Sequence, residues 1–234
     1  MLATRSATNT LRTQRRHDLA WCLGLLAALL LWDAAGFDLA LMRRLASPAG
    51  FAWREHWVTT IVLHQGGRAV GWIVLAALVL QLWRPLPFAR DLALAERRWC
   101  LATCLLCLLV IPLLKHASLT SCPWSLAEFG GTGRYVSHWQ LGTADGGGGG
   151  CFPSGHASAA FAFLAGYFAL RQRHPLAARR WLWGVVCLGL VFGAGQTVRG
   201  AHYPSHTLWT AWICLALTLA SHNGWQAWTT RGRR

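Results

Sequence analysis

The sequence predicts an all-α polytopic membrane protein, built as a bundle of six transmembrane helices. Three observations support this fold class. Of the 234 residues, 54% are hydrophobic and only 13% are charged, whereas a soluble domain usually carries about a quarter charged residues. Six apolar segments each approach the roughly 20 residues that cross a bilayer core. The basic residues cluster between these segments, as they do in loops retained on the cytoplasmic side of a membrane.

The six apolar segments occupy most of the chain. Their approximate ranges are 19–36, 64–83, 99–115, 155–171, 181–199 and 205–222. Tryptophan, with 15 copies, gathers near their ends, as in the aromatic belts of bilayer interfaces. The stretch 37–63 predicts an interfacial connector, and Gly66, Gly67 and Arg68 interrupt the start of the second segment. We therefore expect a basic N-terminal tail over 1–18, a membrane domain over 19–222 and a C-terminal tail over 223–234.

The distribution of basic residues predicts the orientation. If both tails lie in the cytoplasm, fifteen of the 22 basic residues fall in the tails and in the two inner connections. They are Arg5, Arg12, Arg15, Arg16, Arg84, Arg90, Arg97, Arg98, Arg171, Arg173, Arg179, Arg180, Arg231, Arg233 and Arg234. This pattern predicts a multi-pass protein of a bacterial inner membrane, with 116–154 as a long periplasmic loop. A loop of that length is usually functional or disordered.

The formal charge of +14 could instead indicate nucleic-acid binding. The arginines are divided among short loops between apolar segments, so the membrane topology explains them better. We therefore expect the bilayer as a partner and no nucleic acid.

Three short stretches combine residues suited to phosphate chemistry: KHASLTSCP from Lys115 to Pro123, PSGH from Pro153 to His156, and RGAHYPSH from Arg199 to His206. Each lies at the outer end of a predicted spanning segment. Three ends that are distant in the sequence would then meet at one membrane face, which predicts a single site there.

Each stretch has a physical rationale. Lys115 either snorkels to the interface or supplies a fixed cation for a phosphate. Ser154 is a candidate N-cap, and a helix N-terminus offers free N–H groups to an anion. An imidazole such as that of His202 can attack phosphorus and form a phosphohistidine. A second imidazole, that of His156, can protonate the leaving oxygen and then activate water.

These stretches resemble the three-part signature of the type-2 phosphatidic acid phosphatase family, which also includes vanadium haloperoxidases. That signature is Lys-x6-Arg-Pro, then Pro-Ser-Gly-His, then Ser-Arg-x5-His-x3-Asp. The resemblance covers about 115–209 and implies that Lys115 binds phosphate, while Ser154 and Gly155 line the phosphate pocket. It also implies that His156 is the general acid and His202 the nucleophile. Membrane segments are not typical of a soluble haloperoxidase, so that activity is not expected.

The chain departs from the signature at the residues around the nucleophile. Cys122 stands where the first motif has Arg, and the Ser-Arg pair of the third motif falls on Gly195 and Gln196. Arg199, about one helical turn past Gln196, is the expected replacement cation.

Other replacements remain open. Arg134 and Arg68 are weaker candidates for the cation. The motif Asp falls on His206, which could orient His202 only as a neutral acceptor. Glu128 or Asp145 of the loop could serve in its place.

Two of the eight cysteines, Cys122 and Cys151, lie in the predicted outer loop, where an oxidising compartment favours a disulfide between them. The alternative is two free thiols, because sequence alone does not give their geometry. No paired Cys/His spacing typical of zinc occurs, and no metal or other cofactor is expected.

The expected function is hydrolysis of a lipid phosphate or pyrophosphate, without metal, through a phosphohistidine. Candidate substrates are phosphatidate, phosphatidylglycerol phosphate, undecaprenyl pyrophosphate and lipid A phosphate. A phosphotransferase that uses the same phosphohistidine remains open, as does a non-catalytic lipid-binding or transport protein on the same fold.

Overall fold

The computed structural model describes residues 2–47 and 49–231, and the regular secondary structure of this part of the chain is entirely helical, with no β-strand. The long helices are α1 (Leu2–Ala34), α3 (Gly67–Leu80), α4 (Leu94–Ala117), α7 (Pro175–Val198) and α8 (Pro204–Arg231). The shorter helices are α2 (Phe37–Leu45), α5 (Ser158–Phe161) and α6 (Ala165–Leu170). A π-helix, η1 (Val58–Gly66), leads into α3, and 3-10 turns are η2 (Pro87–Ala89), η3 (Pro123–Ser125), η4 (Ala127–Phe129) and η5 (Ala162–Leu164).

Four of these helical stretches are long and apolar enough to cross a membrane: Arg12–Ala34, Val58–Leu80, Leu94–Ala117 and Pro175–Val198. They correspond to four of the six predicted segments. The fourth predicted segment forms a shorter apolar stretch, Ser158–Leu170, and the sixth lies within α8. The chain is therefore an all-helical membrane protein, and a count of six spanning helices stays a prediction.

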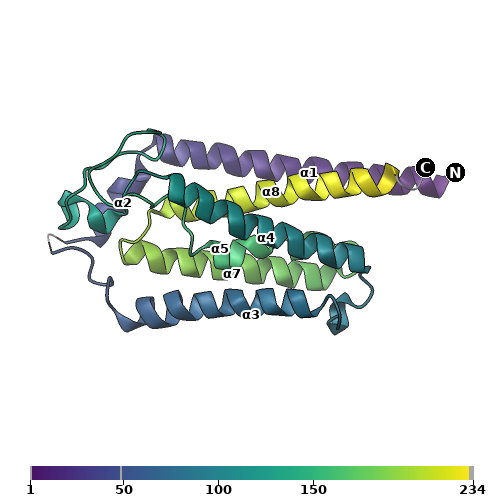
Figure 1. Ribbon diagram of the computed structural model, residues 1–234. Coiled ribbons are helices and arrows are strands. Elements are labelled where there is room, and N and C mark those ends of the chain that lie inside the picture. Colours follow the sequence, from purple (N-terminus) through teal and green to yellow (C-terminus); the bar gives the residue numbers. More distant parts are fainter. Residues whose placement is uncertain (1, 48, 232–234) are drawn as a thin grey trace.

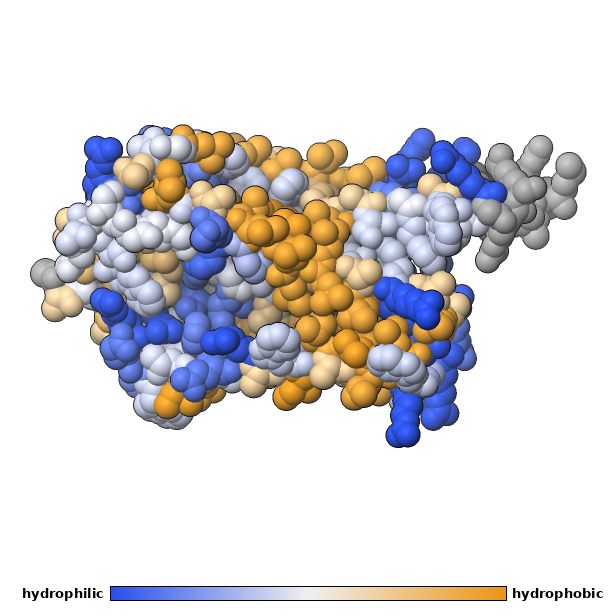
Figure 2. All heavy atoms as spheres, in the orientation of Figure 1, coloured by the Kyte–Doolittle hydropathy of each residue, from blue (hydrophilic) through white to orange (hydrophobic). Residues whose placement is uncertain are grey.

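The helices run along one bundle axis and reverse direction at each connection (Figure 1). The beginning of α1, the end of α8 and the connections 81–93 and 171–174 lie at one end. The loop before α5 and the turn between α7 and α8 lie at the other end. Hydrophobic residues form a band across the middle of the visible face, with hydrophilic residues toward both ends (Figure 2). This pattern suits a bilayer around the middle of the bundle.

Two predicted boundaries differ from the observed helices. The first predicted segment begins at residue 19, whereas α1 already begins at Leu2. The second begins at residue 64, whereas the helix begins at Val58, because the glycine pair continues η1 into α3 with helical backbone angles. Arg233 and Arg234 of the predicted C-terminal tail lie outside the described residues.

The centre of the bundle is formed by α5, η5 and α6, which α4, α7 and α8 contact. Small residues allow this close packing, since Ala157, Ala162 and Ala165 are completely buried. On α4, Cys104, Cys107 and Ile111 are also completely buried in the same apolar core. The turn Pro153–His156 directly precedes this central stretch, so the core fixes the position of that turn.

Candidate active site

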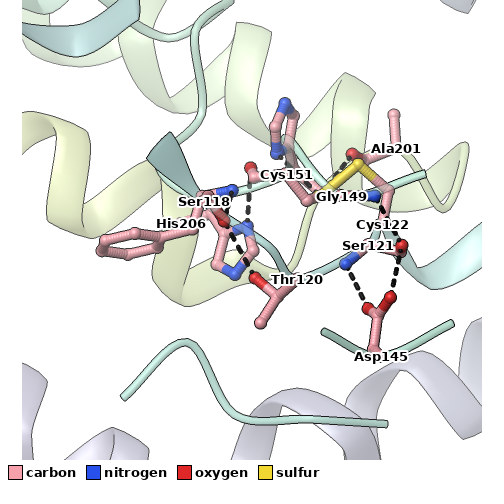
Figure 3. Close-up of a disulfide and its surroundings, with 11 residues drawn as sticks. Ser118, Thr120, Ser121, Cys122, Asp145, Gly149, Cys151, Ala201 and His206 are labelled. Atoms are coloured by element: carbon pink, nitrogen blue, oxygen red, sulfur yellow. Dashed lines mark hydrogen bonds between the residues drawn. A yellow bond between two sulfur atoms is a disulfide. The ribbon is translucent and has the colours of Figure 1, made fainter. Parts of the chain in front are cut away.

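The long loop between α4 and α5 is closed by a disulfide between Cys122 and Cys151, with their Cα atoms 5.1 Å apart (Figure 3). These are the two cysteines whose pairing the sequence suggests. Cys122 lies near the end of the Lys115–Pro123 stretch, and Cys151 precedes the Pro153–His156 turn. The bond therefore fixes the ends of two of the three predicted motifs next to each other.

Hydrogen bonds near the disulfide hold the glycine-rich part of this loop in place. Asp145 accepts hydrogen bonds from the backbone N–H and the hydroxyl of Ser121 (Figure 3). It also accepts one from the N–H of Gly147. Burial opposes ionisation of this carboxyl group, but the donors together lower the pKa of Asp145. Gly149 and Gly150 have φ angles of 62° and 64°, which explains why glycine occupies these positions.

A cavity of about 530 Å³ opens beside this loop end. All three predicted stretches contribute to its wall, through Lys115, through Gly155 and His156, and through His202. Gln196 of α7 lines it as well. The structure thus brings together Lys115, His156 and His202, which were expected to meet in one site.

His156 is fixed by contacts with η1 and α7. Its Nε2 donates a hydrogen bond of 3.0 Å to the Leu63 carbonyl, because a carbonyl oxygen can only accept. Its ring stacks on that of His64, with centroids 4.6 Å apart, and also contacts Phe192. Since Nε2 carries a proton, Nδ1 is the nitrogen of the neutral ring that can accept one.

Ser154, next to His156 in the same turn, is completely buried. Its N–H donates to the carbonyl of His206, and its own carbonyl accepts a hydrogen bond of 2.9 Å from the Thr210 hydroxyl. Its hydroxyl has no hydrogen-bond partner among the described residues, and Ser154 does not line the cavity. The structure therefore places the Ser154 backbone in the framework of the turn.

His202 lies in the turn between α7 and α8 and is only 5% exposed. Its Nδ1 lies 3.5 Å from Sγ of Cys151, which leaves Nε2 as the nitrogen farther from the disulfide. Burial, the Lys115 charge and the nearby His156 together lower the pKa of His202 well below its ordinary value. His202 therefore stays neutral, with a free lone pair, at ordinary pH.

His206, at the position of the motif Asp, is buried and does not line the cavity. Its Nδ1 donates a hydrogen bond of 3.1 Å to the Cys151 carbonyl. Its ring centroid is 5.8 Å from that of His202, in an edge-on arrangement. His206 thus anchors the disulfide segment and packs beside His202.

The two acidic residues considered as alternatives are engaged elsewhere. Glu128 forms an exposed ion pair with Arg43, and Asp145 binds Ser121 and Gly147. Within the described ranges, no carboxylate hydrogen-bonds to His202, so this nucleophile candidate differs from the aspartate-bound histidine of the signature.

Arg199 and Arg134, expected as cations, do not line the cavity. Arg199 Nε donates a hydrogen bond of 3.0 Å to the Arg54 carbonyl, and its guanidinium lies 5.6 Å from the ring centroid of Trp124. Arg134 is an exposed loop residue whose backbone N–H binds the carbonyl of Asp145. Arg199 therefore ties the turn before α8 to the segment that precedes η1.

Two other side chains line the cavity from the opposite helix: His64 of η1 and Arg68 of α3. From the sequence, Arg68 was only a weaker candidate for the phosphate-binding cation, and His64 was not predicted as a site residue. The signal was present, because both are ionisable residues in an apolar helix and lie four residues apart, on one face.

A family model described as the PAP2 superfamily matches residues 96–230, which is more than half of the chain. The match includes Lys115, His156 and His202, whereas η1 and α3 lie before it. No curated protein and no solved structure shows a significant match to the chain.

Proposed function

The chain belongs to the PAP2 superfamily, and from this premise we propose that it is a membrane phosphatase acting on lipid phosphates or pyrophosphates. PAP2 membership supports phosphate ester hydrolysis in general. The proposal adds the substrate class, the phosphohistidine route and independence of metal. Phosphatidate, phosphatidylglycerol phosphate, undecaprenyl pyrophosphate and lipid A phosphate are the candidate substrates.

The observation that carries the proposal is the composition of the cavity wall. One part of it holds Lys115, His156 and His202, and none of the described residues that line it is acidic. Another part is apolar, with Leu75 and Leu108 from two facing helices. A phosphate group suits the first part and a hydrocarbon chain the second, so the cavity matches an amphiphilic phosphate ester.

The geometry supports separate roles for the two histidines. In the first step, Nε2 of His202 forms a bond to phosphorus while the bond from phosphorus to the lipid oxygen breaks, and His156 gives that oxygen a proton. In the second step, water attacks phosphorus and gives a proton to His156, and the nitrogen–phosphorus bond breaks. Lys115 balances the charge on the phosphoryl oxygens in both steps.

The Leu63 carbonyl supports the role of His156 in both steps. It holds the proton on Nε2, so Nδ1 is the atom that exchanges a proton with the lipid oxygen and with water. Burial lowers the pKa of His156 to about 4, and the Leu63 carbonyl acts against this lowering because it stabilises the protonated ring that the first step requires.

We also propose the orientation. Basic residues gather at the bundle end that holds the start of α1 and the end of α8, including Arg97, Arg171 and Arg173. By the positive-inside rule, that end lies on the cytoplasmic side of a bacterial inner membrane. The cavity and the disulfide-closed loop then face the periplasm, where disulfides persist.

The direct test measures phosphate release by the detergent-purified protein from each candidate lipid and from water-soluble glycerol 3-phosphate, with and without EDTA. We expect release from at least one lipid, little from the soluble ester, and no effect of EDTA. His202→Ala should abolish both phosphate release and the radiolabelled phosphoprotein that the wild type forms with a radiolabelled lipid, trapped in alkaline detergent because phosphohistidine is labile in acid. Equal rates on lipid and soluble esters would refute the lipid preference. Transfer of phosphate to an added alcohol, without release, would identify a phosphotransferase.

A further inference from the structure

Arg68 is a cationic residue in the wall of the cavity. It lies one residue into α3, inside the stretch Val58–Leu80 that is apolar enough to span a membrane. Its side chain is exposed, and no hydrogen bond or ion pair joins it to any other described residue. A guanidinium in such a helix is costly unless it faces water or an anion, and the cavity that Arg68 lines offers room for an anion.

The helix face that carries Arg68 is the face that forms the cavity. His64, Arg68, Gly71, Trp72 and Leu75 all line it, and their spacing of four, three, one and three residues places them along one side of the helix. Lys115 enters from α4 on another side. The cavity thus receives two positive charges from two different helices, and none of its described wall residues is acidic.

Close contacts fix η1 and the start of α3 against the turn Pro153–His156. Gly67, the residue before Arg68, lies so near His156 that a Cβ atom there would be 2.9 Å from Nε2 of the imidazole. The Leu63 carbonyl binds the same nitrogen. A π-helix, which is often found at functional sites, supplies both Leu63 and His64. Arg68 is therefore held next to His156 by backbone packing on its N-terminal side.

The positions where the signature has arginine carry no charge here. Gln196 lines the cavity, but its side-chain amide lies 3.3 Å from Nδ1 of His64. Cys122 is consumed in the disulfide. Arg199 is bound to the Arg54 carbonyl outside the cavity wall. Within the part of the chain that the structure describes, Arg68 is thus the cation that joins Lys115 there.

We propose that Arg68 is the second phosphate-binding residue of this site and, together with Lys115, clamps the phosphoryl group between α3 and α4. This inference rests on the proposed function for its substrate. It assigns a role to a helix that precedes the residues matched by the family model. A planar guanidinium can donate two parallel hydrogen bonds to phosphate oxygens, which a lysine cannot.

The test compares Arg68→Ala, Arg68→Lys and, as a matched control, Arg44→Ala. Arg44 is an exposed arginine in the last turn of α2 and lies outside the cavity wall. We expect Arg68→Ala to lower kcat/KM about 10- to 100-fold, the loss expected for a charge-assisted hydrogen bond. Arg68→Lys should recover part of this loss, and Arg44→Ala should match the wild type.

A binding measurement separates this inference from the proposed function. Inorganic phosphate should raise the thermal unfolding temperature of the wild type and of Arg44→Ala, and should raise that of Arg68→Ala much less. If the wild type binds phosphate in this way but releases none from any lipid, the proposed function fails and the role of Arg68 stands. Equal phosphate stabilisation of Arg68→Ala and wild type, equal kcat/KM, or a wild type that does not bind phosphate would overturn the role of Arg68.

Discussion

The imidazole rings of His64 and His156 stack with their centroids 4.6 Å apart and an angle of 17° between their planes. The two residues are 92 positions apart in the chain, and only His156 belongs to a recognisable motif. The side-chain amide of Gln196 lies within hydrogen-bond distance of Nδ1 of His64. His64 therefore packs between Gln196 and the ring of the proposed general acid.

From this stack we predict that His64→Ala lowers kcat by up to about tenfold, because an aromatic contact contributes roughly 0.5–1.5 kcal/mol. KM should change little, since Lys115 and Arg68 are the proposed phosphate-binding residues. His64→Phe keeps the stack and should retain most of the activity. His116→Ala, an exposed histidine at the end of α4, serves as the control. A large rise in KM with unchanged kcat would show that His64 binds substrate.

The contacts of Arg199 lead to a different expectation from the one that the sequence suggests. Arg199→Ala removes the hydrogen bond to the Arg54 carbonyl and the contact with Trp124. We predict a loss of about 1.5–3 kcal/mol in the free energy of unfolding, as for other hydrogen bonds from charged groups, with phosphate affinity nearly unchanged. Thermal unfolding without phosphate measures the loss of stability, and the shift that inorganic phosphate produces reports the phosphate affinity. Loss of phosphate stabilisation in this variant would restore Arg199 as a phosphate-binding residue.

The pH dependence follows from His202. Burial and the Lys115 charge hold its pKa well below the ordinary value of 6.5. The ring therefore keeps its lone pair as the pH falls below 6.5, and loses it only when the pH falls through the lowered pKa. The acid limb of kcat/KM that reports this group should lie well below pH 6.5.

Removing the Lys115 charge should raise the pKa of His202 and move this acid limb to higher pH. Lys115→Met should show that movement, whereas Lys115→Arg keeps the charge and should show none. Comparing the profiles of the three enzymes on one substrate cancels the titration of the substrate itself. Coincident acid limbs in wild type and Lys115→Met would show that the charge does not act on His202.

The disulfide should matter for both stability and activity. It closes a loop with a sequence separation of 29, for which the loop-entropy estimate is about 3–4 kcal/mol. Since Nδ1 of His202 lies 3.5 Å from Cys151 Sγ, reduction should also lower kcat. We therefore expect dithiothreitol to reduce the unfolding temperature and the activity of the wild type.

The double variant Cys122→Ser with Cys151→Ser is the control for this prediction. It should start at the lower values and should not respond to dithiothreitol. Mass spectrometry after alkylation shows whether both thiols are free in each sample. A wild type with both thiols alkylated and with full stability would contradict the prediction.

The sequence predicted the parts of the fold and of the candidate site that depend on local pattern. Long apolar runs predict the helices, and the alternation of helix ends predicts that Lys115, His156 and His202 lie at one end of the bundle. The contacts made by Arg199 depend on Trp124 and Arg54, which lie in irregular segments without a periodic signal. The orientation of those segments is decided by tertiary packing, so the cation could not be assigned from the pattern alone.

The sequence did not reveal that η1 contributes to the candidate site, for a related reason. The two glycines and the arginine at the start of the second apolar segment look like an interruption of a helix. In the structure, the helix continues through them, because Gly67 fits against His156 where a side chain would collide. Tertiary contact thus explains a local composition that weakens the prediction of a helix.

Gly67 also limits which substitutions this protein can tolerate. Any side chain at position 67 would have to displace the His156 ring or the Phe192 ring, both of which lie within 3.0 Å of its Cβ position. The residues on either side of this contact, His64 and Arg68, face the cavity. The stretch His64-x-x-Gly67-Arg68 is therefore a short, searchable pattern, and it could identify further divergent sequences that build their phosphate site in the same way.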